Sequence, residues 1–133
     1  MKLKLFFFTL LFVPATLFAV DKNELLSNFQ EYKEDYYNLQ DQCYPTIRKK
    51  SITAGIDLQN CIWDKDQLLL YKYNFDNILY ESSYQRYSRL FNLFKSFALE
   101  QSNDFEGLAR QEVYFINDSF KLQKNILLQT YGY

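Results

Sequence analysis

Apolar side chains recur along the first part of the chain at the spacing of an α-helix. Between Lys22 and Gln42 they are separated by four, three, four and three positions, which places them on one helical face. These residues are Leu25, Phe29, Tyr32, Tyr36 and Leu39. The spacing predicts a helix over 22–42 that ends at Tyr44-Pro45-Thr46, because proline lacks the backbone N–H that a helix needs. Three heptads are short for a coiled-coil dimer, so we favour packing inside a bundle.

A second helical pattern extends from about Asp57, a candidate N-cap, to about Gln101, and no glycine or proline interrupts it. Two sets of residues each lie near one face: Leu58, Ile62, Leu69, Tyr73 and Asp76, and then Tyr80, Tyr84, Tyr87, Phe91, Phe94 and Ala98. Serine and asparagine bond the backbone locally and favour breaks. The segment is therefore either one long helix or two helices, with a break near Asn74, Asp76 and Asn77 or at Ser82-Ser83.

The last pattern predicts a helix from the candidate cap Asn103 to about Gln129. Its expected apolar face consists of Phe105, Ala109, Val113, Ile116, Phe120 and Leu127. Only 3 glycines and 2 prolines are present, which suits long helices better than a β-fold with its frequent turns. We therefore predict an all-α fold, an antiparallel bundle of three to four helices.

The first 19 residues have the pattern of a secretory signal peptide. Lys2 and Lys4 precede an uncharged apolar stretch from Leu5 to Leu17, which is shorter than the roughly 20 apolar residues that span a membrane. Cleavage is expected after Ala19, and the alternative is an uncleaved anchor. The expected organisation is a signal peptide over 1–19 and a helical bundle domain over 20–133, in a periplasmic or secreted protein with no stable membrane anchor after cleavage.

The chain has 2 cysteines, Cys43 and Cys61. In an exported protein an even number of cysteines indicates a disulfide, and the alternative is two buried free thiols. A Cys43–Cys61 bridge would tie the end of the first helix to the start of the second.

Composition and charge exclude several classes of function. Without Lys2 and Lys4, 13 basic and 16 acidic residues remain, a net charge of −3, which argues against nucleic-acid binding. The chain has no histidine, so triads that use histidine as the base and His-ligated metal sites are excluded. Asp64 and Asp66 point in different directions on a helix, and a calcium loop over 57–66 would lack its glycine turn. We expect no enzymatic activity, no cofactor and no metal.

Aromatic residues make up 20% of the chain, with 13 Phe and 12 Tyr. Trp63, two positions after Cys61, is expected to pack in the core beside the disulfide. The tyrosines Tyr71, Tyr73, Tyr80, Tyr84 and Tyr87 are either part of the core or partly exposed at an interface, where tyrosine is enriched.

Several residues resemble the pattern of the LprI-type lysozyme inhibitors, a family of small exported helical domains. The family has a pair of cysteines, then Asp-x-x-Leu-Asn-x-x-Tyr, and later Gln-x-x-Trp followed by an arginine and a further cysteine. The matching residues here are Cys43, Cys61, Asp66, Leu69, Tyr73 and Gln111, with Leu70 in the place of the Asn and Tyr114 in the place of the Trp. Asp118 lies near the place of the arginine, and the later cysteine is absent.

The resemblance implies an exported bundle that binds and blocks a bacteriolytic lysozyme. It implies a candidate binding surface formed by Asp66, Leu69, Tyr73, Gln111 and Tyr114. The acidic net charge would suit a basic protein partner. The alternative hypothesis, motivated by the regular apolar spacing, is a structural or chaperone-like helical oligomer of the bacterial periplasm.

Overall fold

The computed structural model describes residues 20–47, 59–100 and 105–133. These residues form four α-helices and one π-helical turn and contain no β-strand: α1 (Lys22–Ile47), η1 (Gln59–Trp63), α3 (Asp64–Lys72), α4 (Asp76–Glu100) and α5 (Phe105–Thr130). The predicted signal peptide over 1–19, the Asp57 cap, Leu58 and the Asn103 cap lie outside the described residues.

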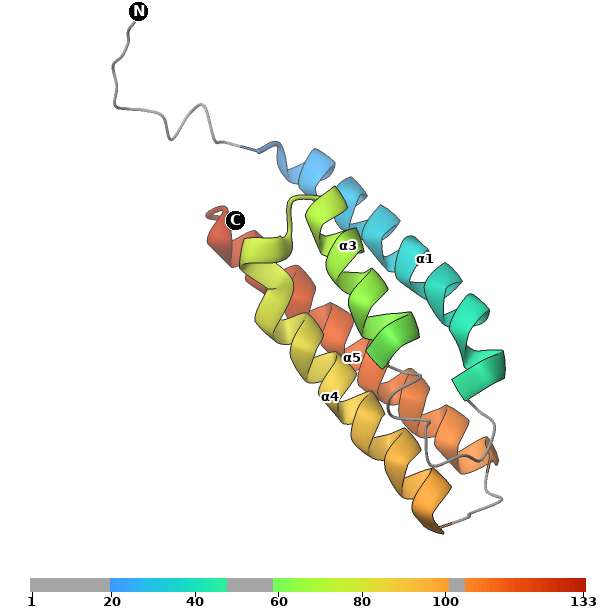
Figure 1. Ribbon diagram of the computed structural model, residues 1–133. Coiled ribbons are helices and arrows are strands. Elements are labelled where there is room, and N and C mark those ends of the chain that lie inside the picture. The colour runs from blue at the N-terminus through green and yellow to red at the C-terminus, as the bar shows by residue number, and fades with distance from the viewer. Residues whose placement is uncertain (1–19, 48–58, 101–104) are drawn as a thin grey trace, which may run out of the picture.

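The helices form an up-and-down antiparallel bundle (Figure 1). α1 and α4 run in one direction, and α3 and α5 run in the other. Each of α1 and α4 packs against both α3 and α5, so α3 lies diagonally across the bundle from α5. The hydroxyl of Tyr133 donates to the backbone carbonyl of Val20, which joins the two ends of the described chain. The predicted all-α bundle is confirmed.

The apolar face predicted for the first helix is confirmed, because all five of its residues are buried in the core. The predicted end is wrong, since α1 continues through Pro45 to Ile47. A proline removes one backbone hydrogen bond of the preceding turn, but the residues after it can keep helical angles. Here the helix ends two residues later.

The segment after Cys61 is broken at Asn74, one of the two predicted positions. Asn74 has φ of 59°, the left-handed conformation in which asparagine is tolerated. The backbone N–H of Asn74 donates to the Tyr71 carbonyl at 3.1 Å, and that of Phe75 donates to the Leu70 carbonyl at 2.8 Å. These two bonds, together with the burial of Leu70 and Phe75, form a Schellman motif that ends α3. The alternative break at Ser82-Ser83 is wrong, because both serines lie inside α4.

The apolar faces predicted for α4 and α5 are only partly right. Phe94, Ile116, Phe120 and Leu127 are buried, but Tyr80 and Tyr84 are exposed and Val113 is 59% exposed. The buried positions instead include polar side chains: Ser82, Ser83 and Arg86 on α4, and Glu112 and Gln123 on α5. The side chains of Ala98, Phe105 and Ala109 lie outside the described part of the structure. The prediction failed because it assigned only apolar residues to the interior.

Candidate functional site

Arg86, on the inner face of α4, lies at the centre of a buried polar network. Its Nη2 donates to Oδ2 of Asp66 on α3 at 3.0 Å and to the hydroxyl of Tyr32 on α1 at 2.6 Å. The Tyr32 hydroxyl in turn donates to Oδ1 of Asp66 at 2.7 Å. All three side chains are buried, so this ion pair and its phenol are closed off from water.

The same guanidinium also reaches α5. Its Nη1 donates to Oε1 of Gln123 at 2.7 Å and to the hydroxyl of Ser119 at 3.2 Å. The amide nitrogen of Gln123 donates back to α4, to Ser83 at 2.8 Å and to Ser82 at 3.1 Å. The network therefore connects side chains of all four helices through one arginine.

Two aromatic rings lie close to the guanidinium. The Arg86 carbon Cζ lies 4.2 Å from the ring centroid of Tyr36 and 4.6 Å from that of Phe120. A cation over an aromatic face is attracted by the ring quadrupole, and the attraction is stronger away from water. Burial raises the pKa of Tyr36 to about 12, so this ring stays neutral beside the charge.

Burial and mutual attraction set the charge states of the network. Burial acts to lower the pKa of Arg86, but Tyr32 and Asp66 outweigh it and raise that pKa, so the guanidinium stays charged. Burial raises the pKa of Asp66, and Arg86 opposes this rise. Burial also raises the pKa of Tyr32, which therefore acts as a neutral donor. Because none of these groups reaches the surface, the network has a structural role, holding four helices in one arrangement.

A second polar cluster joins α1 to α3 near the surface. Oδ2 of Asp35 accepts hydrogen bonds from the Tyr73 hydroxyl at 2.6 Å and from Lys72 Nζ at 3.0 Å. The hydrogen bond from Tyr73 and then that from Lys72 lower the pKa of the Asp35 carboxyl. Tyr73, predicted for a binding surface, is thus engaged in holding α3 against α1.

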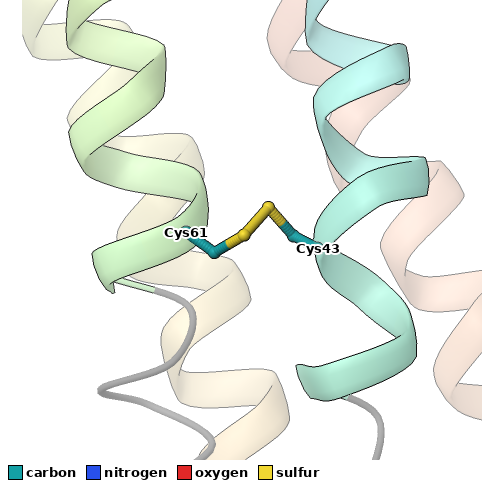
Figure 2. The surroundings of a disulfide bond; sticks show 2 residues. All are labelled: Cys43 and Cys61. Carbon is teal, nitrogen blue, oxygen red and sulfur yellow. A yellow bond between two sulfur atoms is a disulfide. The ribbon is translucent and has the colours of Figure 1, made fainter.

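The disulfide joins Cys43 in α1 to Cys61 in η1, as predicted (Figure 2). The two Cα atoms are 5.8 Å apart, and the bridge joins positions that are 18 apart in the sequence. In the chain-entropy description, a loop of this length stabilises the fold by about 3 kcal/mol. The bridge fixes η1 on the bundle and so positions Trp63, which ends this turn.

Trp63 is buried, as predicted, and three tyrosines of α4 surround it. Tyr80 and Tyr84 pack edge-on against the indole, with ring centroids at 5.4 and 5.5 Å, and Tyr87 stacks on it at 5.5 Å. Trp63 is only 7% exposed and Tyr87 is also buried, whereas Tyr80 and Tyr84 are 46% and 42% exposed. We call these four residues the Trp63 surface. It is an aromatic patch formed by η1 and α4.

The five residues predicted for a binding surface do not form one. Asp66 is 1% exposed and paired with Arg86, so its prediction as a surface residue is wrong. It faces inward because its carboxylate is the counter-ion of a buried cation. Leu69 is partly buried on α3, whereas Gln111 and the 67% exposed Tyr114 lie on α5, the helix diagonally opposite.

Sequence reasoning missed Arg86, the residue that organises the interior. The available signal was its position in α4: Leu79, Arg86 and Leu90 are seven and four positions apart, so a helical face that carries both leucines also carries the arginine. A charged residue on such a face needs a buried partner, and Asp66 supplies it. The two are 20 positions apart and on different helices, so no local pattern links them.

The described residues contain no group of three or more side chains arranged to hold a metal ion. In that same part of the chain, no helix combines the length and the apolar character needed to span a membrane. No protein-family model, curated protein or solved structure matches this chain. The resemblance to the lysozyme inhibitors therefore stays a prediction.

Proposed function

We propose that this protein is an exported binding module that contacts a protein partner through the Trp63 surface. The observation that carries the proposal is the pair of half-exposed tyrosines, Tyr80 and Tyr84, held in place against Trp63. Tyrosines fixed on a rigid helix lose little conformational entropy when a partner binds, and such residues dominate the binding energy of many interfaces. The disulfide at Cys61 contributes by fixing the turn that carries the tryptophan.

Acidic groups flank these aromatic rings. Asp76 lies four positions before Tyr80, on the same side of α4, and Asp64 follows Trp63 directly. Burial, then Tyr84 and then Asp64 raise the pKa of Tyr87, so the carboxylate of Asp64 acts on the patch itself. Aromatic anchors bordered by negative charge favour a partner with a basic surface, because complementary charge steers association.

We propose a lysozyme-like bacteriolytic enzyme as the partner. Support comes from the resemblance of the cysteine pair and of the residues around Asp66 and Gln111 to the lysozyme inhibitors, and from the acidic charge of the chain after Lys2 and Lys4. In this proposal the protein occupies the enzyme surface and excludes its cell-wall substrate. The interior network and the disulfide keep the contact face rigid.

The test is inhibition of lysozyme-driven cell-wall lysis by the oxidised protein, measured across lysozyme classes. We expect near-stoichiometric inhibition of at least one class. The double variant Tyr80→Ser/Tyr84→Ser should weaken inhibition at least tenfold. The matched control Tyr114→Ser removes an exposed tyrosine of α5 and should leave inhibition unchanged.

Three results would contradict parts of this proposal. If no lysozyme class is inhibited, while far-UV circular dichroism shows that the protein is folded, the proposal of a lysozyme partner is wrong. A loss with Tyr114→Ser but not with Tyr80→Ser/Tyr84→Ser places the contact on α5 instead. A stable oligomer in a solution mass measurement, dispersed by the double variant, shows that the Trp63 surface joins copies of this chain.

A further inference from the structure

A groove of about 420 Å³ lies between α1 and α5, away from the Trp63 surface. Its apolar wall includes Phe29 of α1 and Phe120 of α5, whose ring centroids are 6.1 Å apart in an edge-on arrangement. The Tyr37 hydroxyl of α1 donates to Oδ1 of Asn117, a groove residue of α5, at 3.1 Å. This bond ties the two helices together at the groove. A volume of this size is in the range of small-molecule sites in proteins.

Three lysines line the groove, although the chain as a whole is slightly acidic. Lys121 and Lys124 are three positions apart and so share one side of α5, and Lys33 projects from α1. Like charges placed in this way repel one another, and no carboxylate lines the groove to offset them. Among the described residues, none of the three forms an ion pair.

The other contacts of the groove residues do not neutralise the ammonium charges of the three lysines. Lys33 Nζ lies 5.6 Å from the ring centroid of Phe120, so a cation borders the apolar wall directly. Gln30, which also lines the groove, donates to Glu34 at 3.2 Å, and Glu34 is not a groove residue. The groove therefore combines three lysines with an apolar floor, in which Leu26 is partly exposed and Phe29 and Phe120 lie beneath it.

We infer that this groove binds a small amphipathic anion, whose acidic group meets Lys33, Lys121 and Lys124 while its apolar part lies against Leu26, above the buried rings of Phe29 and Phe120. An anion between the three ammonium groups relieves their repulsion, because its charge is opposite to theirs. The aliphatic stems of the lysines extend the apolar wall beside the rings. The inference does not depend on the Trp63 surface, which involves neither α1 nor α5.

The experiment titrates the purified oxidised protein with octanoate at low salt and follows backbone amide shifts by NMR. Octanol and octylammonium share the apolar chain and differ only in the head group. We expect saturable binding of octanoate at least tenfold tighter than either, with the largest shifts at residues around Lys33 and Phe120. Lys121→Gln and Lys124→Gln should each weaken octanoate binding three- to tenfold, and raising the salt concentration should weaken it further.

Lys65→Gln is the matched control, because it removes the charge of one exposed lysine on α3, which is not one of the two groove helices, and should leave affinity unchanged. Equal binding of octanol and octanoate would overturn the inference, because the lysines would then contribute nothing. Inorganic diphosphate binding as tightly as octanoate would show a site for bare charge and overturn the amphipathic class. Binding to phosphatidylglycerol vesicles without any binding of free octanoate would assign the lysines to a membrane surface and also contradict it.

Discussion

Arg86→Met removes the guanidinium at the centre of the bundle and leaves the carboxylate of Asp66 buried without its counter-ion. Arg86 makes hydrogen bonds of 3.0 Å or less to Asp66, Tyr32 and Gln123. Hydrogen bonds that involve a charged group contribute roughly 1.5–3 kcal/mol each, and breaking a buried pair by removing one partner costs about 3–5 kcal/mol in total. Since a domain of this size is stable by only about 5–15 kcal/mol, the variant should lose a large part of its free energy of unfolding.

The assay is urea unfolding of the oxidised protein, followed by far-UV circular dichroism at pH 7. Arg89→Met is the matched control, because Arg89 lies on the same helix but its side chain is exposed. Its ion pair with Asp118 is also exposed and is long, at 3.8 Å. This control should change stability by less than about 1 kcal/mol. The double variant Arg86→Met/Asp66→Leu replaces both charges with apolar groups and should recover much of the loss, since the cost comes from the unpaired carboxylate.

The pH dependence of Arg86→Met provides a further check. Without Arg86, burial still outweighs the hydrogen bond from Tyr32 and keeps the folded-state pKa of Asp66 above the unfolded value of about 3.9. The part of the destabilisation that comes from the unpaired carboxylate is then absent well below about pH 3.9, where the carboxyl is protonated in both states, and it grows as the pH rises above that value. Two results would refute the assigned role of the network. One is a loss of less than about 1 kcal/mol in the free energy of unfolding of Arg86→Met at pH 7. The other is a double variant whose loss equals or exceeds the sum of the losses of its two single variants.

Three other changes test separate parts of the structure. Replacing Cys43 and Cys61 together by alanine should lower the free energy of unfolding by about 3 kcal/mol, and no change in the urea midpoint would show that the bridge adds nothing. Asn74→Ala should cost about 1 kcal/mol because of the positive φ at this position, whereas Asn74→Gly should cost nothing, and equal thermal midpoints for the two variants would contradict this. Tyr73 and Lys72 lower the folded-state pKa of Asp35. The loss of stability in Asp35→Asn, relative to the natural protein, should therefore be constant above about pH 5 and should vanish as acid protonates Asp35. A difference that persists unchanged at pH 2 in thermal unfolding would count against that account.

The features that sequence reasoning identified are those with a local signal. The face of α1 is read directly from its five apolar residues, and the break at Asn74 follows from the preference of asparagine for turns. The disulfide follows from the cysteine pair together with the predicted export signal, and the position of Trp63 follows from its closeness to Cys61. Each depends on neighbouring residues or on a simple count.

The interior of α4 could not be predicted in this way. Tyrosine counts as apolar in a periodicity, yet Tyr80 and Tyr84 are 46% and 42% exposed. Arg86 and Ser83 count as polar, yet they are buried because partners on other helices satisfy them. Such partnerships depend on which helices become neighbours, and the groove between α1 and α5 depends on the same pairing.

The central claim is that the protein binds its partner through the Trp63 surface, and the most direct measurement is the binding footprint. Amide hydrogen exchange of the oxidised protein would be compared with and without a lysozyme of each class as the proposed partner. The account predicts that exchange slows around Trp63 and between Tyr80 and Tyr87, with no change near Gln111 and Tyr114. Protection confined to α5, or the absence of binding to any lysozyme class, would contradict it.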